Sequence, residues 1–364
     1  MGDLRLMKGN EVLAEAAIRC GCDGYFGYPI TPQSEVMETL MLRAPWNETG
    51  MKVLQAESEV AAINMLYGAA ATGKKVLTSS SSPGISLMAE GISYIAGAEL
   101  PCLVINVQRG GPGLGTIQPS QADYSQAVKG GGHGDYKMIV LAPSSVQEMN
   151  DFVDLAFKLA FKYRNPAMIL ADGAIGQMME KVELSDYKKC WTDEEVIEKW
   201  GSWATTGKPS SRERNVITSL ELDSEKMEAN NQRFQKKYRQ MEAEEQRYET
   251  FQCEDAEYVL VAFGTSARVC QKSVEIAREK GLKVGLLRPI SLFPFPKKII
   301  SELAPKVKGF LSVEMNAGQM VEDIKLAVHE AGSTRRVEFF GRMGGIIPTP
   351  GEVVDALEQK FLKE

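Results

Sequence analysis

Three short segments of the sequence combine residues that could hold an organic anion or share a proton. In the first, Tyr28–Pro32 (YPITP), two prolines fix the backbone on both sides of Thr31. The apolar run Tyr25–Gly27 predicts a strand before it, and a helix is expected from Ser34. Thr31 would then present its hydroxyl at the carboxyl end of a strand, where parallel sheets bind ligands. An ordinary turn with a helix cap explains the same residues equally well.

The second segment, Gln55–Ala62 (QAESEVAA), places two glutamates where a predicted strand meets a predicted helix. Acidic residues at a helix start are commonly stabilised by the helix dipole, and this explanation suffices for Glu57. Glu59 is followed by three apolar residues, so its carboxylate could face a closely packed interface. A carboxylate in such a place could share a proton with the nitrogen of a heterocycle.

The third segment, Asn106–Asp123, starts at the end of the apolar run Cys102–Val107 and contains no clear helix or strand. Long irregular loops in compact domains are usually functional. Arg109 stands at the base of this loop, and its planar guanidinium could donate two hydrogen bonds to a carboxylate. The alternative interpretation is a surface loop that carries an arginine incidentally.

The elements that would position these residues alternate between strand and helix through the first 185 positions. Such alternation is typical of a parallel sheet with helices on both faces. The expected strands are Tyr25–Gly27, Lys52–Gln55, Lys75–Ser79, Cys102–Val107, Met138–Leu141 and Ala167–Ala171. The expected helices are Glu11–Cys20, one from Ser34, Ser58–Thr72, Ile85–Ala96 and Val146–Tyr163.

A different pattern follows this alternation. Residues 187–215 contain three tryptophans among charged and small residues, with little periodicity. The charged segment 219–250 predicts one long helix, because five apolar residues recur at every seventh position. They are Leu220, Met227, Phe234, Met241 and Tyr248. This narrow apolar stripe could lie on the chain's own surface or grip another chain, and the pattern does not decide between the two.

A second α/β unit is expected from Tyr258 onward. Its predicted strands are 258–262, 283–287, 310–314 and 336–340, and its predicted helices are 266–280 and 318–331. The sequence therefore predicts an N-terminal domain over residues 1–186, a linker with the long helix over 187–254 and a smaller domain over 255–364.

Composition and charge limit the classes of function. The net charge of −6 argues against binding to nucleic acids or anionic membranes. No segment approaches the ~20 apolar residues of a membrane span. The N-terminus lacks a signal-peptide pattern, so a cytoplasmic location is expected. The six cysteines form no Cys-x-x-Cys pair, which argues against a metal or iron–sulfur site in this chain.

Taken together, the segments resemble the α-subunit of pyruvate- and 2-oxoacid:ferredoxin oxidoreductases. The matching residues are Tyr28–Pro32, Ser58–Ala62, Thr78–Gly84 and Asn106–Arg109. The resemblance covers residues 8–185 strongly and residues 256–364 less specifically. The opening LMKGNEVLAEAAI and the loop GGPGLGTIQPSQADY are most similar to subunits that act on branched-chain 2-oxoacids, such as 2-oxoisovalerate, or on 2-oxoglutarate.

The resemblance implies a fold of two parts. The first is a pyrimidine domain of the thiamine-diphosphate-binding fold, with a parallel sheet covered by helices on both faces. The second is a smaller, transketolase-C-terminal-like α/β domain. Glu59 would contact N1′ of the aminopyrimidine of thiamine diphosphate. Pro29, Ser82, Pro83 and Gly84 would line the same side of the site.

The implied activity is the oxidative decarboxylation of a 2-oxoacid to acyl-CoA with reduction of ferredoxin. The residues of this family that match Thr31 and Arg109 bind the carboxyl-bearing end of the substrate. A noncatalytic assembly subunit with a decayed site is one alternative, and the retained Glu59, Thr31 and Arg109 argue against it. A subunit of a lipoamide-using thiamine enzyme is another.

Two parts of the family's machinery are missing from this sequence. It contains no Gly-Asp-Gly followed at the family's spacing by an asparagine, the pattern that binds magnesium and the diphosphate, and no cluster-ligating cysteines. The resemblance therefore implies a diphosphate-binding β-subunit, with γ- and ferredoxin-like δ-subunits beside it. Magnesium and the iron–sulfur clusters would lie on these partner chains, and the cofactor site would be shared.

Overall fold

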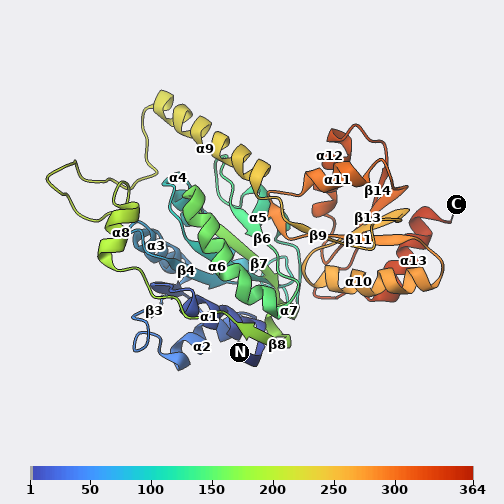
Figure 1. The fold of residues 1–364 in the computed structure, drawn as a ribbon, viewed down its shortest axis with the longest axis horizontal. Coiled ribbons are helices and arrows are strands. Elements are labelled where there is room, and N and C mark those ends of the chain that lie inside the picture. The colour runs from blue at the N-terminus through green and yellow to red at the C-terminus, as the bar shows by residue number, and fades with distance from the viewer. Residues whose placement is uncertain (1–2, 364) are drawn as a thin grey trace.

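Seven strands form the sheet of the N-terminal unit in the computed structural model, which describes residues 3–363 (Figure 1). Their order is β12-β6-β7-β5-β4-β2-β3, and all neighbours run parallel except β12, which is antiparallel to β6. Their bounds are β2 Gly24–Gly27, β3 Lys52–Gln55, β4 Val76–Ser80, β5 Leu103–Gln108, β6 Ile139–Leu141, β7 Ala167–Asp172 and β12 Ser291–Phe293. The predicted parallel sheet is confirmed, although β12 comes from the predicted C-terminal domain.

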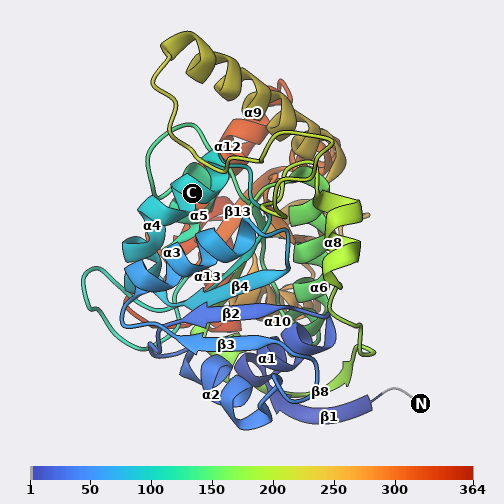
Figure 2. The ribbon, with the colours of Figure 1, turned by 90° about the vertical axis from the view of Figure 1, so that its left-hand side faces the viewer.

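Helices cover both faces of this sheet, as Figure 2 shows. On one face α3 packs against α4, and on the other α1 packs against both α2 and α6. The central strand β5 is buried along its whole length, which explains why it is apolar apart from Asn106 and Gln108. The helix bounds are α1 Gly9–Arg19, α2 Ser34–Arg43, α3 Glu59–Ala70, α4 Ser82–Gly97 and α6 Val146–Tyr163.

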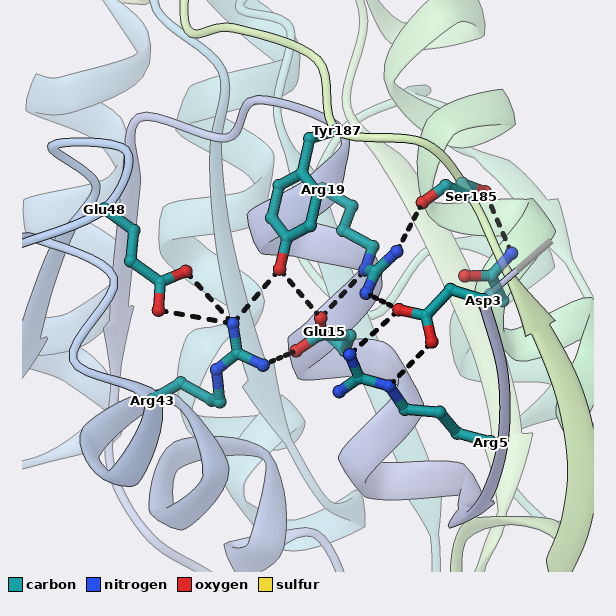
Figure 3. A network of polar contacts seen from close by, with 9 residues as sticks. Asp3, Arg5, Glu15, Arg19, Arg43, Glu48, Ser185 and Tyr187 are labelled. Carbon is teal, nitrogen blue, oxygen red and sulfur yellow. Dashed lines mark hydrogen bonds and ion pairs between the residues drawn. The ribbon is translucent and has the colours of Figure 1, made fainter. Parts of the chain in front are cut away.

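A pair of strands that the sequence did not predict joins the two ends of the N-terminal unit. Strand β1 (Asp3–Lys8) pairs antiparallel with β8 (Met179–Leu184). A charge network that is buried at Glu15 and Arg19 and exposed at its edges joins α1 to α2 and to β1 (Figure 3). In this network the Glu15 carboxylate accepts from Arg19 Nε at 2.8 Å and pairs with Arg43 Nη1 at 3.0 Å. Both oxygens of this nearly buried carboxylate are therefore paired, as a buried charge requires.

A second sheet forms the C-terminal unit, which lies beside the N-terminal unit in Figure 1. Its order is β14-β13-β10-β11-β9, with only β9 antiparallel to its neighbour. Its strands are β9 Tyr248–Phe251, β10 Tyr258–Val261, β11 Val284–Pro289, β13 Gly309–Glu314 and β14 Arg336–Gly341. Its helices are α10 Gly264–Glu279, α11 Lys297–Leu303, α12 Met320–Glu330 and α13 Pro350–Phe361. The predicted second α/β unit is confirmed, with α11 and α13 as additions.

The prediction of one helix over residues 219–250 was wrong in its extent. Helix α9 spans only Ser224–Glu244, because the Asp223 side chain accepts from two backbone amides and caps its start. Tyr248 belongs to strand β9, so the seven-residue pattern crosses two kinds of element. Phe234, Tyr238 and Met241 are buried in the core of the chain. The second half of α9 therefore packs on its own chain.

Three shorter helices complete the fold. They are α5 (Tyr124–Lys129), α7 (Gly173–Gln177) and α8 (Asp193–Trp200). Helix α8 lies in the stretch where the sequence showed little periodicity. Trp191, just before this helix, and Trp200, its last residue, both pack against Phe161 of α6. Among residues 3–363, no helix is both long enough and apolar enough to cross a membrane.

Candidate active site

Glu59 is the first residue of α3, and the chain before it fixes its position. Ser58 is the extended N-cap residue, whose side chain accepts from the Ala61 amide. The Glu59 side chain is only 6% exposed, and no residue between 3 and 363 donates a hydrogen bond to its carboxylate or forms an ion pair with it. The carboxylate oxygens themselves keep some contact with solvent, so a bound molecule can reach them and supply the missing partner.

Gly84 lies directly against Glu59, in the first turn of α4. A Cβ atom at Gly84 would come within 2.8 Å of Glu59 Oε1 and 2.0 Å of Ser80 Oγ. Only glycine therefore allows α4 to approach the end of β4 and the carboxylate so closely. In the described part of the chain, the buried hydroxyls of Ser80 and Ser81 also have no hydrogen-bond partner. This corner of the site thus combines several polar atoms that the protein leaves unsatisfied.

Arg109 directly follows β5 and is 9% exposed. Its Nη1 donates to the Thr31 carbonyl at 2.9 Å, and its Nη2 donates to the Leu114 carbonyl at 3.0 Å. Its buried Nε has no partner within residues 3–363. A guanidinium has five N–H donors. The two bonds therefore leave one further N–H on each Nη for a bound anion, whereas the Nε–H is enclosed by the protein.

Thr31 lies in the turn between β2 and α2, with its side chain exposed. Two amide side chains stabilise this turn by donating to the Pro32 carbonyl, Asn10 at 2.6 Å and Gln177 at 3.2 Å. The structure therefore brings Thr31 and Arg109 together as predicted, although the direct contact is through the Thr31 carbonyl. Pro29 is exposed in the same turn.

The hydroxyl of Ser82 connects the Arg109 loop to α4. Ser82 Oγ accepts from the Arg109 amide at 3.0 Å and donates to Asp123 Oδ2 at 2.6 Å. Asn106 Nδ2 donates to the same carboxylate oxygen at 2.8 Å. Burial raises the pKa of Asp123, while these two hydrogen bonds oppose the shift.

No role was predicted for Asn106 and Asp123, although they are the two ends of the third segment. A signal was present, because Asn106 and Gln108 are polar residues in an otherwise apolar, fully buried strand. Buried polar groups in proteins are nearly always hydrogen-bonded, so each required a partner. Gln108 meets this requirement by accepting from the Asp123 amide at 3.0 Å.

A cavity of about 380 Å³ lies on the side of Arg109 that faces the C-terminal unit. It is bounded by the first turn of α4, the loop after β5 and the C-terminal unit, and Arg109 and Asp123 are its only charged lining residues. Ser82 and Pro83 line it, whereas Glu59, Thr31, Pro29 and Gly84 do not. The Glu59 corner and the Arg109 cavity are thus adjoining but separate parts of one surface.

Two family profiles match the chain. The profile described as "Pyruvate flavodoxin/ferredoxin oxidoreductase, thiamine diP-bdg" matches residues 15–257, and "Pyruvate:ferredoxin oxidoreductase core domain II" matches residues 256–353. Among solved structures, the 2-oxoglutarate:ferredoxin oxidoreductase from Magnetococcus marinus with 2-oxoglutarate, coenzyme A and succinyl-CoA bound superimposes with a TM-score of 0.84. At 24% identity this likeness shows the fold alone. It covers 99% of this chain and 65% of that longer chain.

Two curated relatives match along nearly their whole length. The ketoisovalerate oxidoreductase subunit VorB of Methanothermobacter marburgensis is 52% identical over 94% of this chain and 93% of its own. The 2-oxoglutarate synthase subunit KorA of Methanocaldococcus jannaschii is 35% identical over 97% of this chain and 99% of its own. These matches confirm the resemblance that the three segments predicted. The chain belongs to the thiamine-diphosphate-binding family of pyruvate flavodoxin/ferredoxin oxidoreductases.

Proposed function

We propose that this chain is the pyrimidine-binding subunit of a 2-oxoacid:ferredoxin oxidoreductase. The complete enzyme would convert a 2-oxoacid and coenzyme A to acyl-CoA and CO₂ while reducing ferredoxin. The observation that carries the proposal is Glu59 at the start of α3, a residue only 6% exposed whose carboxylate has no hydrogen-bond or ion-pair partner among residues 3–363. The names of the relatives support a branched-chain 2-oxoacid or 2-oxoglutarate as the substrate.

The residues around Glu59 fit the aminopyrimidine of thiamine diphosphate. Such a ring needs an acceptor or shared proton at N1′, further polar partners and a close approach of backbone. Glu59 offers the first and Gly84 offers the third, whereas the unsatisfied hydroxyls of Ser80 and Ser81 are enclosed and would offer the second only after a local rearrangement. When bound, thiamine diphosphate supplies the nucleophilic carbon and the electron sink for decarboxylation. Glu59 would hold the proton that its carboxylate shares with N1′.

Arg109 and Thr31 would hold the carboxylate of the 2-oxoacid. Two donors of Arg109 already bond to main-chain carbonyls, which orients the guanidinium before substrate arrives. Its remaining donors can form charge-assisted hydrogen bonds to a carboxylate. The exposed hydroxyl of Thr31 adds one more donor beside it.

The rest of the enzyme would be supplied by partner chains. We expect a β-subunit with the magnesium and diphosphate site, together with γ- and ferredoxin-like δ-subunits that include the iron–sulfur clusters. The names of the relatives, which are subunits, support a multi-subunit enzyme. Within the part of the chain that the structure describes, no group of three or more acidic, histidine or cysteine side chains is placed to hold a metal ion. We also propose the domain division 1–186, 187–254 and 255–364 and a cytoplasmic location.

A reconstitution experiment tests this function. The purified chain alone should show neither reduction of a viologen dye with any 2-oxoacid nor the visible absorbance of an iron–sulfur cluster. Adding the partner subunits, thiamine diphosphate, magnesium and coenzyme A should produce 2-oxoacid-dependent reduction of ferredoxin. A panel with 2-oxoisovalerate and 2-oxoglutarate identifies the substrate. Viologen reduction by the single chain, or activity of the complex with lipoamide in place of ferredoxin, would contradict the proposal.

A further inference from the structure

The loop that begins at Arg109 is fastened at its far end to the C-terminal unit, through Gln121. This side chain is fully buried between the two units. Its Nε2 donates to the Phe263 carbonyl at 2.7 Å, and its Oε1 accepts from Ser266 Oγ at 2.7 Å and from the Met315 amide at 3.1 Å. All three partners belong to the C-terminal unit. They use both ends of the amide, which no apolar side chain could reproduce.

The main chain around Gln121 is held in the same way. The Gln121 amide donates to the Met315 carbonyl at 3.0 Å, and the Gln121 carbonyl accepts from Asn316 Nδ2 at 2.8 Å. Next to it, the Ala122 carbonyl accepts from Gln319 Nε2 at 2.7 Å. The end of the loop is thus bound to the C-terminal unit through backbone and side chain alike.

Gln121 binds at the carboxyl edge of the sheet in the C-terminal unit. Phe263 follows shortly after β10, and Met315 directly follows β13, so both partners lie at the carboxyl ends of neighbouring parallel strands. This edge of a parallel sheet is where α/β units usually bind their ligands. In the C-terminal unit the chain's own loop occupies part of that edge, beside the cavity described above.

The fastened end of the loop leads straight back to Arg109. Residues Arg109 and Pro119 form an isolated antiparallel bridge, and the Gly110 amide donates to the Gln118 carbonyl at 2.9 Å. The Thr116 amide in turn donates to the Gly110 carbonyl at 2.8 Å. A shift of Gln121 would therefore move the strand-like segment on which the start of the loop rests.

We infer that the C-terminal unit positions the substrate-binding loop, and that Gln121 is the positioning residue through which it does so. The inference rests on the proposed role of Arg109 in binding the 2-oxoacid carboxylate. Gln121 touches neither Arg109 nor the reacting atoms, so it acts through the loop. Its replacement should loosen the loop and weaken substrate binding while leaving cofactor binding at Glu59 unchanged.

The chain offers a matched control at a second contact between the two units. Arg268 of α10 donates to the Ser144 carbonyl at 3.0 Å and pairs with Glu180 at 2.9 Å. This contact joins the same two units at a point that does not include the Arg109 loop. Its loss should lower stability without changing the loop.

The test compares Gln121→Met with Arg268→Met in the reconstituted complex. Hydrogen–deuterium exchange should be faster for the Gly110 and Thr116 amides in Gln121→Met and unchanged there in Arg268→Met. The KM for the 2-oxoacid should rise roughly three- to tenfold in Gln121→Met only, the scale of one weakened hydrogen bond between Arg109 and the substrate. The Kd for thiamine diphosphate should stay the same in both. If Gln121→Met fails to assemble, Ser266→Ala removes one of the same bonds and should give a smaller change in the same direction.

The outcomes separate this inference from the proposed function. Unchanged exchange of the loop in Gln121→Met, or equal changes in both variants, would overturn the inference. Arg109→Lys is measured in parallel. If the loop loosens in Gln121→Met but KM stays constant while Arg109→Lys raises it, positioning by Gln121 is again refuted. If neither variant changes KM, the proposed role of Arg109 fails, whereas the loosened loop still supports the structural part of the inference.

Discussion

Glu59 and Arg109 are both nearly buried, yet the protein supports them in opposite ways. The Glu59 carboxylate has no hydrogen-bond or ion-pair partner among residues 3–363. The Arg109 guanidinium already bonds to two carbonyls, and its loop is fastened at Asp123 and at Gln121. The Glu59 carboxylate is therefore left for a bound molecule to pair with, whereas the Arg109 guanidinium is oriented by the protein before a ligand binds. Substitutions at the two sides should therefore differ in what they change.

Glu59→Gln should give the largest effect on catalysis. The amide cannot share a proton with a ring nitrogen as a carboxylate does, so turnover should fall by ~10²–10⁴-fold, the scale for a proton-transfer group. Stability and assembly should be unchanged, because no protein hydrogen bond is lost. The measurement is turnover of the reconstituted complex together with its melting temperature.

Glu57→Gln is the control for this substitution. Glu57 is exposed two residues earlier in the chain, outside α3, and should be neutral. If turnover of Glu59→Gln stayed within about twofold while Glu57→Gln lost activity, the role would pass to Glu57.

Arg109→Lys should give the next largest effect, and on substrate binding. An ammonium cannot reach the Thr31 and Leu114 carbonyls and still offer a fork to a carboxylate. Losing one charge-assisted hydrogen bond costs about 1.5–3 kcal/mol, or roughly ten- to a hundredfold in kcat/KM. The Kd for thiamine diphosphate should barely change. A weakened cofactor with an unchanged KM for the 2-oxoacid would place Arg109 on the pyrimidine side.

Gly84→Ala tests how closely α4 packs against Glu59. The added Cβ would overlap Ser80 Oγ and press on the Glu59 carboxylate, so the substitution should cost about 1–3 kcal/mol of unfolding free energy. Gly68→Ala in α3 is the control, because among the described residues no atom beyond its chain neighbours and the nearby backbone of α3 lies within 4 Å of its added Cβ. It should stabilise the chain by about 0.4–1 kcal/mol. Denaturant unfolding of the isolated chain measures both, and equal effects would refute the crowding argument.

The sequence predicted most of the N-terminal sheet because its signals are local. Strand β3 and helix α6 were predicted to the residue, since Lys52–Gln55 is short and bounded and Val146–Tyr163 has a strong helical period. Strands β1 and β12 were missed, because each pairs with a strand far away in the sequence and has little periodicity of its own. The long helix was overextended because the seven-residue pattern continued past the Asp223 cap and into β9.

The same distinction applies to the site. Glu59, Thr31 and Arg109 could be selected because their motifs are contiguous, and the structure places each near the end of a strand. The residues that hold these three in place could not be selected from the sequence, because they act through contacts between distant positions. Gln121 and the Met315 amide, for example, lie 194 residues apart in the sequence. Only the fold shows that the loop occupies the carboxyl edge of the second sheet.

Thr31→Val should give the smallest effect of the series, for a structural reason. The contact between Thr31 and Arg109 is through the Thr31 carbonyl, which valine retains, and the Pro32 carbonyl keeps its bonds from Asn10 and Gln177. The turn should therefore stay in place, and only the exposed hydroxyl is lost. Losing one neutral hydrogen bond costs about 0.5–1.5 kcal/mol, so the KM for the 2-oxoacid should rise by roughly two- to tenfold.

Thr31→Ser is the matched control, since it keeps the hydroxyl and removes only a methyl group. It should leave KM close to that of the unchanged chain. Both variants leave the main-chain contact with Arg109 intact. A difference in KM between them therefore reports the contribution of the hydroxyl alone, apart from that of the backbone of the turn. A KM increase in Thr31→Val as large as that in Arg109→Lys would mean that the hydroxyl binds the carboxylate as strongly as the guanidinium. The orientation of Arg109 by the Thr31 carbonyl would then be the lesser contribution of this turn.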